Sequence, residues 1–318
     1  MKNLDWLKVA KYMLLSRELD HFEETVLAPK GQIKLQFSAM GHELAQVLLA
    51  QSLTHPNDAA STYYRSRPFM LASGYPLKKA IAGSLALSGG ASEGRDAGVV
   101  FNMPRGQISS GLTVFPASGD VGSQYTPAVG WAQASVYRSR VLREKDWEGV
   151  VSVALGGDGS VATNGFWSAL NIATTLKLPV LFFIEDNCYG LSVPSTLQTP
   201  GGNIASNLAA FKNLTVIDSD GTTPQKTWEG ITHAINVVRD CKGPVLLRMQ
   251  VVRIKGHTFI DNQAYKTSEQ LTEEAASDPV LKLRSFLLSE GIPEQTWIDL
   301  EENAKMDIAR LSKLPKLY

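Results

Sequence analysis

The sequence is poor in cysteine and lacks long apolar runs, and each absence excludes a class of protein. Its 318 residues contain two cysteines, Cys188 and Cys241, which are too few for a disulfide framework and lack the spacing of a metal site. This cysteine usage suits a reducing compartment, so we expect a cytoplasmic protein. No apolar run approaches the roughly 18 residues of a membrane span. Residues 1–20 carry charges every few positions, unlike a secretion signal or a transit peptide.

An excess of one charge is also missing. The 31 basic and 31 acidic residues give a formal net charge of zero, and no block of lysines or arginines stands out. No global field attracts nucleic acid or an anionic membrane, so we expect neither as a partner. The phosphate-binding patterns GxGxxG and GxxxxGK[ST] are absent, which argues against an ordinary nucleotide-binding protein.

One stretch, residues 150–192, has the pattern of a strand, a glycine-rich turn, a helix and a second strand. An apolar run at 150–155 ends at Gly-Gly-Asp-Gly-Ser (156–160), and a second run at 180–184 ends at Glu-Asp-Asn (185–187). Open α/β sheets bind their ligands at the carboxyl ends of parallel strands. Both polar clusters are therefore expected at one edge of a sheet.

The remaining pattern predicts an α/β fold, with a doubly wound, mostly parallel sheet flanked by helices and helical extensions at both ends. We expect one domain over 1–318, consisting of a helical arm (1–60), a cofactor-binding core (61–265) and a helical tail (266–318). Residues 88–122, rich in Gly, Ser and Pro, are expected to form an ordered ligand-covering loop. Helices are predicted at 4–27, 42–53, 77–87, 125–142 and 224–238, and further strands at 214–217 and 244–252.

Asp158 and Asn187 are the residues that suggest chemistry. They lie 187 − 158 = 29 positions apart, about the length of one crossover helix and one strand, so two adjacent strand ends would meet at one ion. Mg²⁺ prefers oxygen ligands, here the Asp158 carboxylate, the Asn187 amide and the Tyr189 carbonyl, with phosphate and water completing its shell. Gly159 and Ser160 would offer backbone donors to that phosphate. The alternative, in which residues 156–160 form only a tight turn and Asn187 only caps a helix or turn, does not account for the spacing.

The same segment resembles the thiamine diphosphate motif of the α subunits of 2-oxo acid dehydrogenases, the decarboxylating components of the pyruvate and branched-chain complexes. In that family, GDG is followed by Asn, as in GDGSVATNGFWSALNIATTLKLPVLFFIEDN here. Further similar motifs occur in order along the chain. They are GHELAQV (41–47), YYR (63–65), GRDAG and NMP (between 94 and 104), VGSQYTPAVG (121–130) and GHT (256–258).

The resemblance implies a thiamine diphosphate-binding domain of the diphosphate type and assigns roles to individual residues. Asp158, Asn187 and the Tyr189 carbonyl would bind Mg²⁺, and Gly159 and Ser160 would lie beside the diphosphate. The other implied cofactor contacts are Tyr64 and Arg65 at the diphosphate, Gly119 and Val121 at the aminopyrimidine ring, and His257 near the diphosphate.

His257 matches the histidine of the family's mobile loop, which assists reductive acylation, so it is the implied catalytic residue. Phe37 falls at the substrate pocket, where branched-chain members tend to be aromatic. Tyr63 beside Tyr64 also favours a branched-chain substrate. The implied substrate is a branched-chain 2-oxo acid, with pyruvate or acetoin as the alternative. Ser118, Ser123 and Gln124 match a potassium site of branched-chain members, although Asp120 replaces the usual proline there.

The activating glutamate of thiamine diphosphate enzymes comes from a second α/β domain, which the pattern after residue 265 does not provide. In the family this domain is the β subunit. The resemblance therefore implies an α2β2 heterotetramer that docks on a lipoyl-bearing acyltransferase core. Two departures, Gly106 in place of a usual histidine and Tyr265-Lys266 in place of Tyr-Arg, leave open a non-catalytic subunit that retains the fold.

Overall fold

The computed structural model describes residues 4–33, 35–96, 100–104 and 111–312. Gly106, the departure from the family pattern noted above, lies outside the described residues. Among the described residues, no helix combines the length and the apolar character that crossing a bilayer would require.

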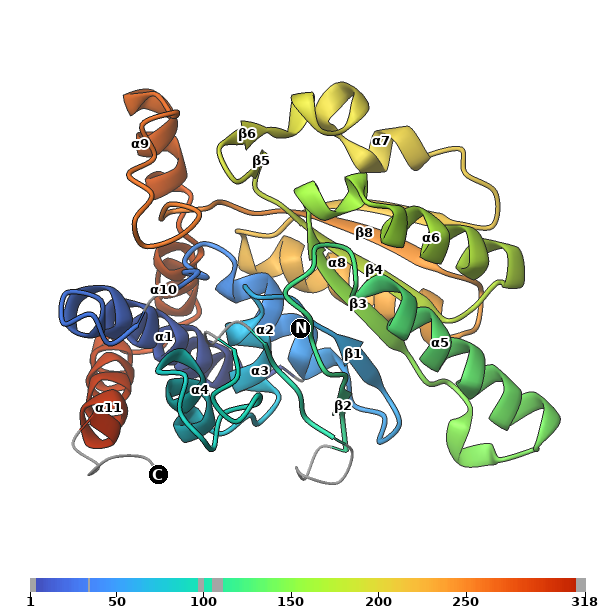
Figure 1. Ribbon diagram of the computed structural model, residues 1–318, viewed down its shortest axis with the longest axis horizontal. Coiled ribbons are helices and arrows are strands. Elements are labelled where there is room, and N and C mark those ends of the chain that lie inside the picture. Colours follow the sequence, from blue (N-terminus) through green and yellow to red (C-terminus); the bar gives the residue numbers. More distant parts are fainter. Residues whose placement is uncertain (1–3, 34, 97–99, 105–110, 313–318) are drawn as a thin grey trace.

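A sheet of six parallel strands forms the centre of the molecule (Figure 1). The order across the sheet is β2-β1-β3-β4-β8-β7, and every neighbouring pair is parallel. The predicted α/β fold is confirmed. The strands are β1 (Ala59–Ser61), β2 (Thr113–Val114), β3 (Ser152–Gly157), β4 (Val180–Asp186), β7 (Thr215–Asp220) and β8 (Val245–Gln250), and a separate antiparallel pair is formed by β5 (Tyr189–Gly190) and β6 (Val193–Pro194).

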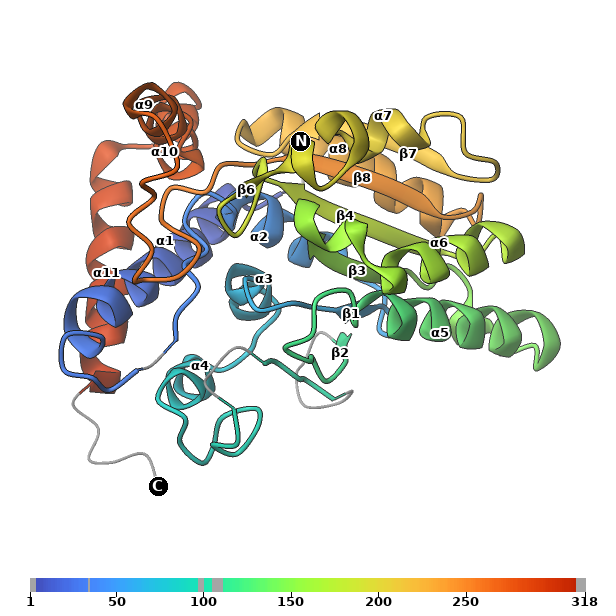
Figure 2. The ribbon, with the colours of Figure 1, turned by 45° about the horizontal axis from the view of Figure 1, so that its top comes forward.

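Alternating side chains along the strands build a hydrophobic core on each face of the sheet. In β4, Leu181 and Phe183 join one core, whereas Phe182 and Ile184 join the other. All seven residues of β4 are buried, as expected for a parallel strand covered on both faces. Figure 2 shows α5 (Tyr125–Val136) and α6 (Asn164–Leu176) in front of the sheet and α8 (Pro224–Arg239) behind it.

The two ends of the chain pack together beside the sheet (Figure 1). Helix α1 (Trp6–Phe22) contacts α10 (Pro279–Ser289) and α11 (Glu294–Ser312), and the rings of Trp6 and Phe286 meet edge to face at 4.9 Å. The predicted helical arm and helical tail therefore form one helical layer. The other helices are α2 (Glu43–Ser52), α3 (Arg67–Ala72), α4 (Leu77–Ser84), α7 (Ile204–Leu208) and α9 (Ser268–Ala276).

Each predicted helix and strand has a counterpart in the structure, but two strands of the sheet, β1 and β2, were not predicted. The strands expected at 150–155, 180–184, 214–217 and 244–252 correspond to β3, β4, β7 and β8. No periodicity predicts β1 or β2, because three and two residues are too short to show one. From β1 the chain adds β2 on one side of the sheet and β3 on the other. The order in which strands are added therefore reverses between β1 and β3. This point is where a doubly wound sheet opens a crevice for ligands.

Candidate active site

One cavity of about 580 Å³ lies at the carboxyl ends of β1, β3, β4 and β8. The structure brings every proposed catalytic, cofactor, substrate and magnesium residue to its wall. From the potassium set, Ser118 and Gln124 line the cavity and Ser123 does not, while Asp120, which replaces the usual proline, also lines it. The lining residues singled out from the sequence are Phe37, Tyr63, Tyr64, Arg65, Gly119, Val121, Asp158, Gly159, Ser160, Asn187, Tyr189 and His257.

Asp158 begins a short 3-10 helix directly after β3 and carries an unsatisfied carboxylate. The side chain is 6% exposed, and its Oδ2 atom has no hydrogen-bond partner. Burial first, and the charge of Asp186 second, raise the pKa of Asp158 to about 7. A buried carboxylate with a free oxygen is costly unless a cation compensates it, so this position fits a metal ligand.

Asn187 follows β4 and lies beside Asp158 because the two strands pair in register. Gly157 at the end of β3 is opposite Glu185 of β4, so the next residues of both strands leave the sheet at the same edge. The Asn187 amide oxygen accepts from the Tyr189 amide at 3.2 Å. In the described part of the chain, no three His, Cys, Asp or Glu side chains gather as a self-contained metal site. An ion here would therefore share its ligands with phosphate and water.

Two buried arginines, Arg65 and Arg253, contribute positive charge to the cavity. They are 2% and 1% exposed. Arg65 donates to the Ser38 carbonyl, and Arg253 donates to the Leu191 carbonyl and the Tyr265 hydroxyl. Neither forms an ion pair with a described carboxylate, and the Arg253 Nε atom has no hydrogen-bond partner. Buried cations without counterions fit the binding of an anion such as a diphosphate.

His257 lies between these charges and an aromatic wall. Its ring packs edge to face against Phe37 and Tyr64, with centroid distances of 5.2 and 5.8 Å. Burial, followed by the positive charges of Arg65 and Arg253, lowers the pKa of His257 to about 4. The imidazole is therefore neutral at pH 7 before any anion binds.

A hydrogen-bonded loop after β8 holds His257 in place. The His257 backbone amide donates to the Asp261 carboxylate at 2.6 Å, and the Tyr265 hydroxyl donates to the same carboxylate oxygen at 2.7 Å. Arg253 in turn donates to Tyr265. The segment that departs from the family pattern thus still connects His257 to one of the two buried arginines.

The aromatic residues proposed for the substrate have unequal roles in the wall. Phe37 and Tyr64 pack against each other at 4.3 Å, and the Arg65 guanidinium lies 5.4 Å from the Tyr64 ring. Tyr63 also lines the cavity, but its hydroxyl donates to the Glu185 carboxylate at 2.8 Å. Its polar end is therefore occupied inside the protein, and its ring is the part that a substrate can contact.

Sequence reasoning missed Arg253, His42 and Glu185. For Arg253 there was a signal, because it follows β8 at the edge of the sheet where ligands bind. His42 is fully buried beside the site, with Nδ1 3.1 Å from Glu185 Oε1. Burial lowers the pKa of His42, so its imidazole is neutral. No spacing in the sequence indicates this contact across 143 positions.

Comparisons with known proteins agree with this geometry. The chain is 29% identical over 271 residues to the pyruvate dehydrogenase E1 component subunit alpha of Zymomonas mobilis, covering 85% of this chain and 72% of that protein. It is 29% identical over 293 residues to the 2-oxoisovalerate dehydrogenase subunit alpha of Bacillus subtilis, covering 90% and 84%. A pyruvate dehydrogenase E1 component subunit alpha of Staphylococcus aureus is 26% identical over 305 residues, covering 95% and 75%.

A family model described as "Dehydrogenase E1 component" matches residues 10–308, which include the whole sheet and the cavity wall. The match extends through both helical ends as well as the site. The chain therefore belongs to the dehydrogenase E1 component family, whose members are thiamine-dependent 2-oxo acid dehydrogenases.

Proposed function

We propose that this chain is the α subunit of an E1 component that oxidatively decarboxylates a branched-chain 2-oxo acid and transfers the acyl group to lipoamide. One observation carries the proposal. A single cavity is lined by two buried guanidinium groups without carboxylate partners and by one buried carboxylate oxygen without a hydrogen bond. That combination fits a diphosphate bridged to a divalent cation, the polar end of thiamine diphosphate.

Different residues of the chain would bind the metal ion, the diphosphate and the aminopyrimidine ring of that cofactor. Asp158, Asn187 and the Tyr189 carbonyl would hold Mg²⁺, while Arg65 would bind the diphosphate beside Tyr64. Gly159 lines the cavity and has no side chain to separate its backbone from a phosphate. Gly159 and Ser160 would offer amides to the diphosphate, and the segment with Gly119 and Val121 would lie along the aminopyrimidine ring.

Bound thiamine diphosphate supplies the carbanion chemistry of 2-oxo acid decarboxylation. The contribution of this chain is to orient the cofactor, exclude water with the Phe37 and Tyr64 wall, and provide a proton carrier at the His257 imidazole. Its pKa is low because burial and two arginines disfavour a further positive charge. A bound diphosphate would offset those charges and bring the imidazole closer to the pKa of a proton donor near neutral pH.

The proposal includes a β subunit that supplies the activating glutamate, in an α2β2 heterotetramer on a lipoyl-bearing acyltransferase core. In the described residues, the six-stranded sheet is followed by helices α9 to α11 and by no second α/β unit. In this proposal, half of the active site comes from the β subunit. We also propose a cytoplasmic location, on the cysteine usage alone.

Pyruvate is the alternative substrate, because relatives named for pyruvate and for 2-oxoisovalerate are equally identical to this chain. We favour the branched-chain acid because Phe37, Tyr64 and Leu35 give the cavity an apolar side.

A potassium ion at the turn 118–124 is a further part of the proposal. There, Asp120 donates its amide to Ser118 Oγ, and Gln124 Oε1 accepts from the Gly122 amide. Comparing unfolding temperatures in potassium and sodium chloride tests that ion.

The test of function is turnover by the chain purified with its β partner. The assembly receives Mg²⁺, thiamine diphosphate, a dye acceptor and, separately, pyruvate, acetoin and three branched-chain 2-oxo acids. We expect the highest kcat/KM with a branched-chain acid and no turnover after Asp158→Ala. Cofactor binding without turnover of any acid would instead identify a non-catalytic subunit that retains the fold.

A further inference from the structure

A buried row of three polar side chains lies behind the metal-binding edge of the cavity. Glu185 in β4 contacts His42, the residue before α2, and His42 contacts Asn187. Glu185 and His42 are fully buried, so water does not compete for these contacts. The distances are 3.1 Å from Glu185 Oε1 to His42 Nδ1 and 3.3 Å from His42 Nε2 to Asn187 Nδ2.

The direction of hydrogen bonding at Glu185 is fixed by its other partners. The Gln46 amide group donates to both oxygens of Glu185 at 3.0 Å, and it also donates to the Arg65 carbonyl. Gln46 Oε1 accepts from the Phe69 amide, so this side chain has one allowed orientation. Tyr63 donates its hydroxyl to Glu185 Oε2. Both oxygens of Glu185 therefore accept hydrogen bonds from partners other than His42.

An acceptor at Glu185 determines the tautomer of His42. Nδ1 must carry the proton, because two acceptors would otherwise meet at 3.1 Å in a buried site. In the neutral ring Nε2 is then an acceptor, and it takes a hydrogen from the Asn187 Nδ2 group. The amide of Asn187 cannot rotate by half a turn without placing its oxygen against Nε2 and its NH₂ group against the Tyr189 amide.

We propose that His42 and Glu185 are positioning residues, which lock the Asn187 amide so that its oxygen is directed to the Mg²⁺ position. The metal in this statement rests on the proposed function. The same carboxylate accepts from Gln46, which also holds the Arg65 carbonyl. Glu185 therefore connects the metal ligand with the turn that carries the diphosphate-binding arginine.

Three variants test the direction of hydrogen bonding rather than the space that the side chains fill. His42→Leu removes the acceptor next to Asn187. Glu185→Leu is similar in length and removes the acceptor that keeps the proton on His42 Nδ1. His42→Gln can direct its NH₂ group to Glu185 and its oxygen to Asn187, so it preserves the direction. His233→Gln, at an exposed position of α8, is the control for a histidine replacement.

The measurement is the Kd of Mg²⁺ for the assembly of chain and β partner, by calorimetry with thiamine diphosphate present. We expect His42→Leu and Glu185→Leu to weaken binding by about 10- to 100-fold, as for outer partners of metal ligands. His42→Gln and His233→Gln should stay near the wild-type Kd. The binding of inorganic diphosphate without metal should change little in all four variants, which separates loss of the metal ligand from general damage to the cavity.

Wild-type affinity in Glu185→Leu, or equal loss in His42→Leu and His42→Gln, would overturn the inference. Should His42→Leu fail to fold, Glu185→Leu and His42→Gln still decide, because the first also removes the hydrogen bond that fixes the tautomer and the second retains the direction of hydrogen bonding. A wild-type assembly that binds neither Mg²⁺ nor thiamine diphosphate would overturn the proposed function as well, whereas normal wild-type binding with insensitive variants overturns this inference alone.

Discussion

Arg65 and Arg253 bring two buried positive charges to one cavity, and the charge of Arg65, after burial, lowers the pKa of Arg253. Elsewhere, buried arginines have carboxylate partners: Arg67 pairs with Asp20 and Arg248 pairs with Asp186. The two positive charges therefore repel each other, and a bound anion would reduce this repulsion. Unfavourable electrostatics of this kind are typical of functional sites.

Replacing Arg65 by methionine should weaken thiamine diphosphate binding by about 10- to 100-fold. A hydrogen bond to a charged group contributes about 1.5 to 3 kcal/mol, and the longer-range attraction to the diphosphate is lost with it. Calorimetry on the chain with its β partner measures the change. Arg138→Met, which removes a half-exposed arginine paired with Glu144, is the matched control and should leave binding unchanged. Equal affinity of the two variants would show that Arg65 does not bind the cofactor.

Asp158→Asn should stabilise the chain in the absence of metal, increasingly so as the pH rises from about 4 to about 7. The pKa of Asp158 is raised to about 7, against about 3.9 in the unfolded chain. Between these two values the native state binds more protons than the unfolded state, so the stability of the wild-type chain falls as the pH rises. Each tenfold change in the ionisation constant corresponds to about 1.4 kcal/mol, so the gain at pH 8 approaches roughly 4 kcal/mol.

Urea unfolding in the presence of a chelator, at pH 4.5 and pH 8, measures this difference. With Mg²⁺ and thiamine diphosphate added, the order should reverse, because only the wild-type carboxylate binds the ion and gains the stability of the complex. A pH-independent difference between the two proteins would mean that Asp158 ionises normally in the folded chain.

The pKa of His257 should rise when a diphosphate binds. In the free protein it is about 4, because burial and the charges of Arg65 and Arg253 disfavour the imidazolium. An anion bound to those arginines would cancel much of their effect. Histidine-selective NMR, with and without inorganic diphosphate and Mg²⁺, gives both values, and His257→Gln identifies the signal. An unchanged pKa would place the anion away from His257.

Much of the fold follows from local pattern. β3 and β4 are apolar runs that end in glycine or acidic residues, so their carboxyl ends, and with them Asp158 and Asn187, could be assigned to one edge of a sheet. The crossover helix fixes the spacing of these two residues. The amphipathic period of α8, with Thr227, Ile231 and Val238 buried on one face, likewise shows in the sequence.

What could not be predicted depends on contacts between distant segments. The pairing of His42 with Glu185 follows from how α2 packs over β4, and the His42 tautomer depends on a third residue, Gln46. Neither leaves a periodic signal in the sequence. Arg253 could be placed at a strand end, but its lack of a carboxylate partner is a property of the packed structure.

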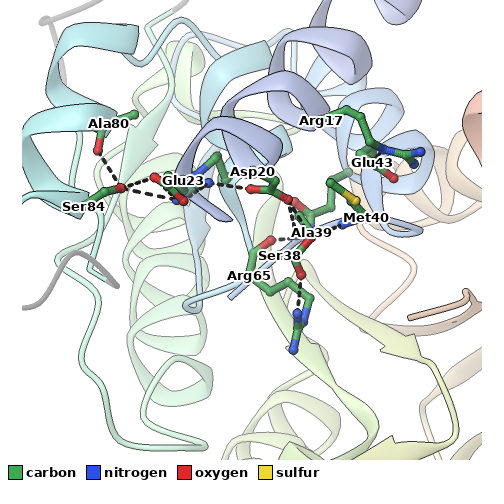
Figure 3. A network of polar contacts seen from close by, with 12 residues as sticks. Arg17, Asp20, Glu23, Ser38, Ala39, Met40, Glu43, Arg65, Ala80 and Ser84 are labelled. Carbon is green, nitrogen blue, oxygen red and sulfur yellow. Dashed lines mark hydrogen bonds and ion pairs between the residues drawn. The ribbon is translucent and has the colours of Figure 1, made fainter. Parts of the chain in front are cut away.

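Asp20, Glu23 and Arg67 form a buried ionic cluster that supports the loop carrying Phe37 (Figure 3). Asp20 accepts from the Ser38 hydroxyl at 2.9 Å and from the Ala39 amide at 2.6 Å. The Ser38 carbonyl in turn accepts from Arg65. The cluster at the end of α1 therefore connects to the wall of the cavity through two hydrogen bonds.

Arg67→Met should reduce the free energy of unfolding by about 3 to 5 kcal/mol, because it leaves two buried carboxylates without their cation. Arg284→Met, which removes an arginine from a partly exposed pair with Glu294, is the control and should have a much smaller effect. Urea unfolding of both variants at neutral pH measures the contrast. Combining Arg67→Met with Asp20→Asn and Glu23→Gln should recover part of the loss, since the unpaired charges are then removed. If the triple variant were no more stable than Arg67→Met alone, packing by the arginine stem, and not its charge, would account for the stability of the cluster.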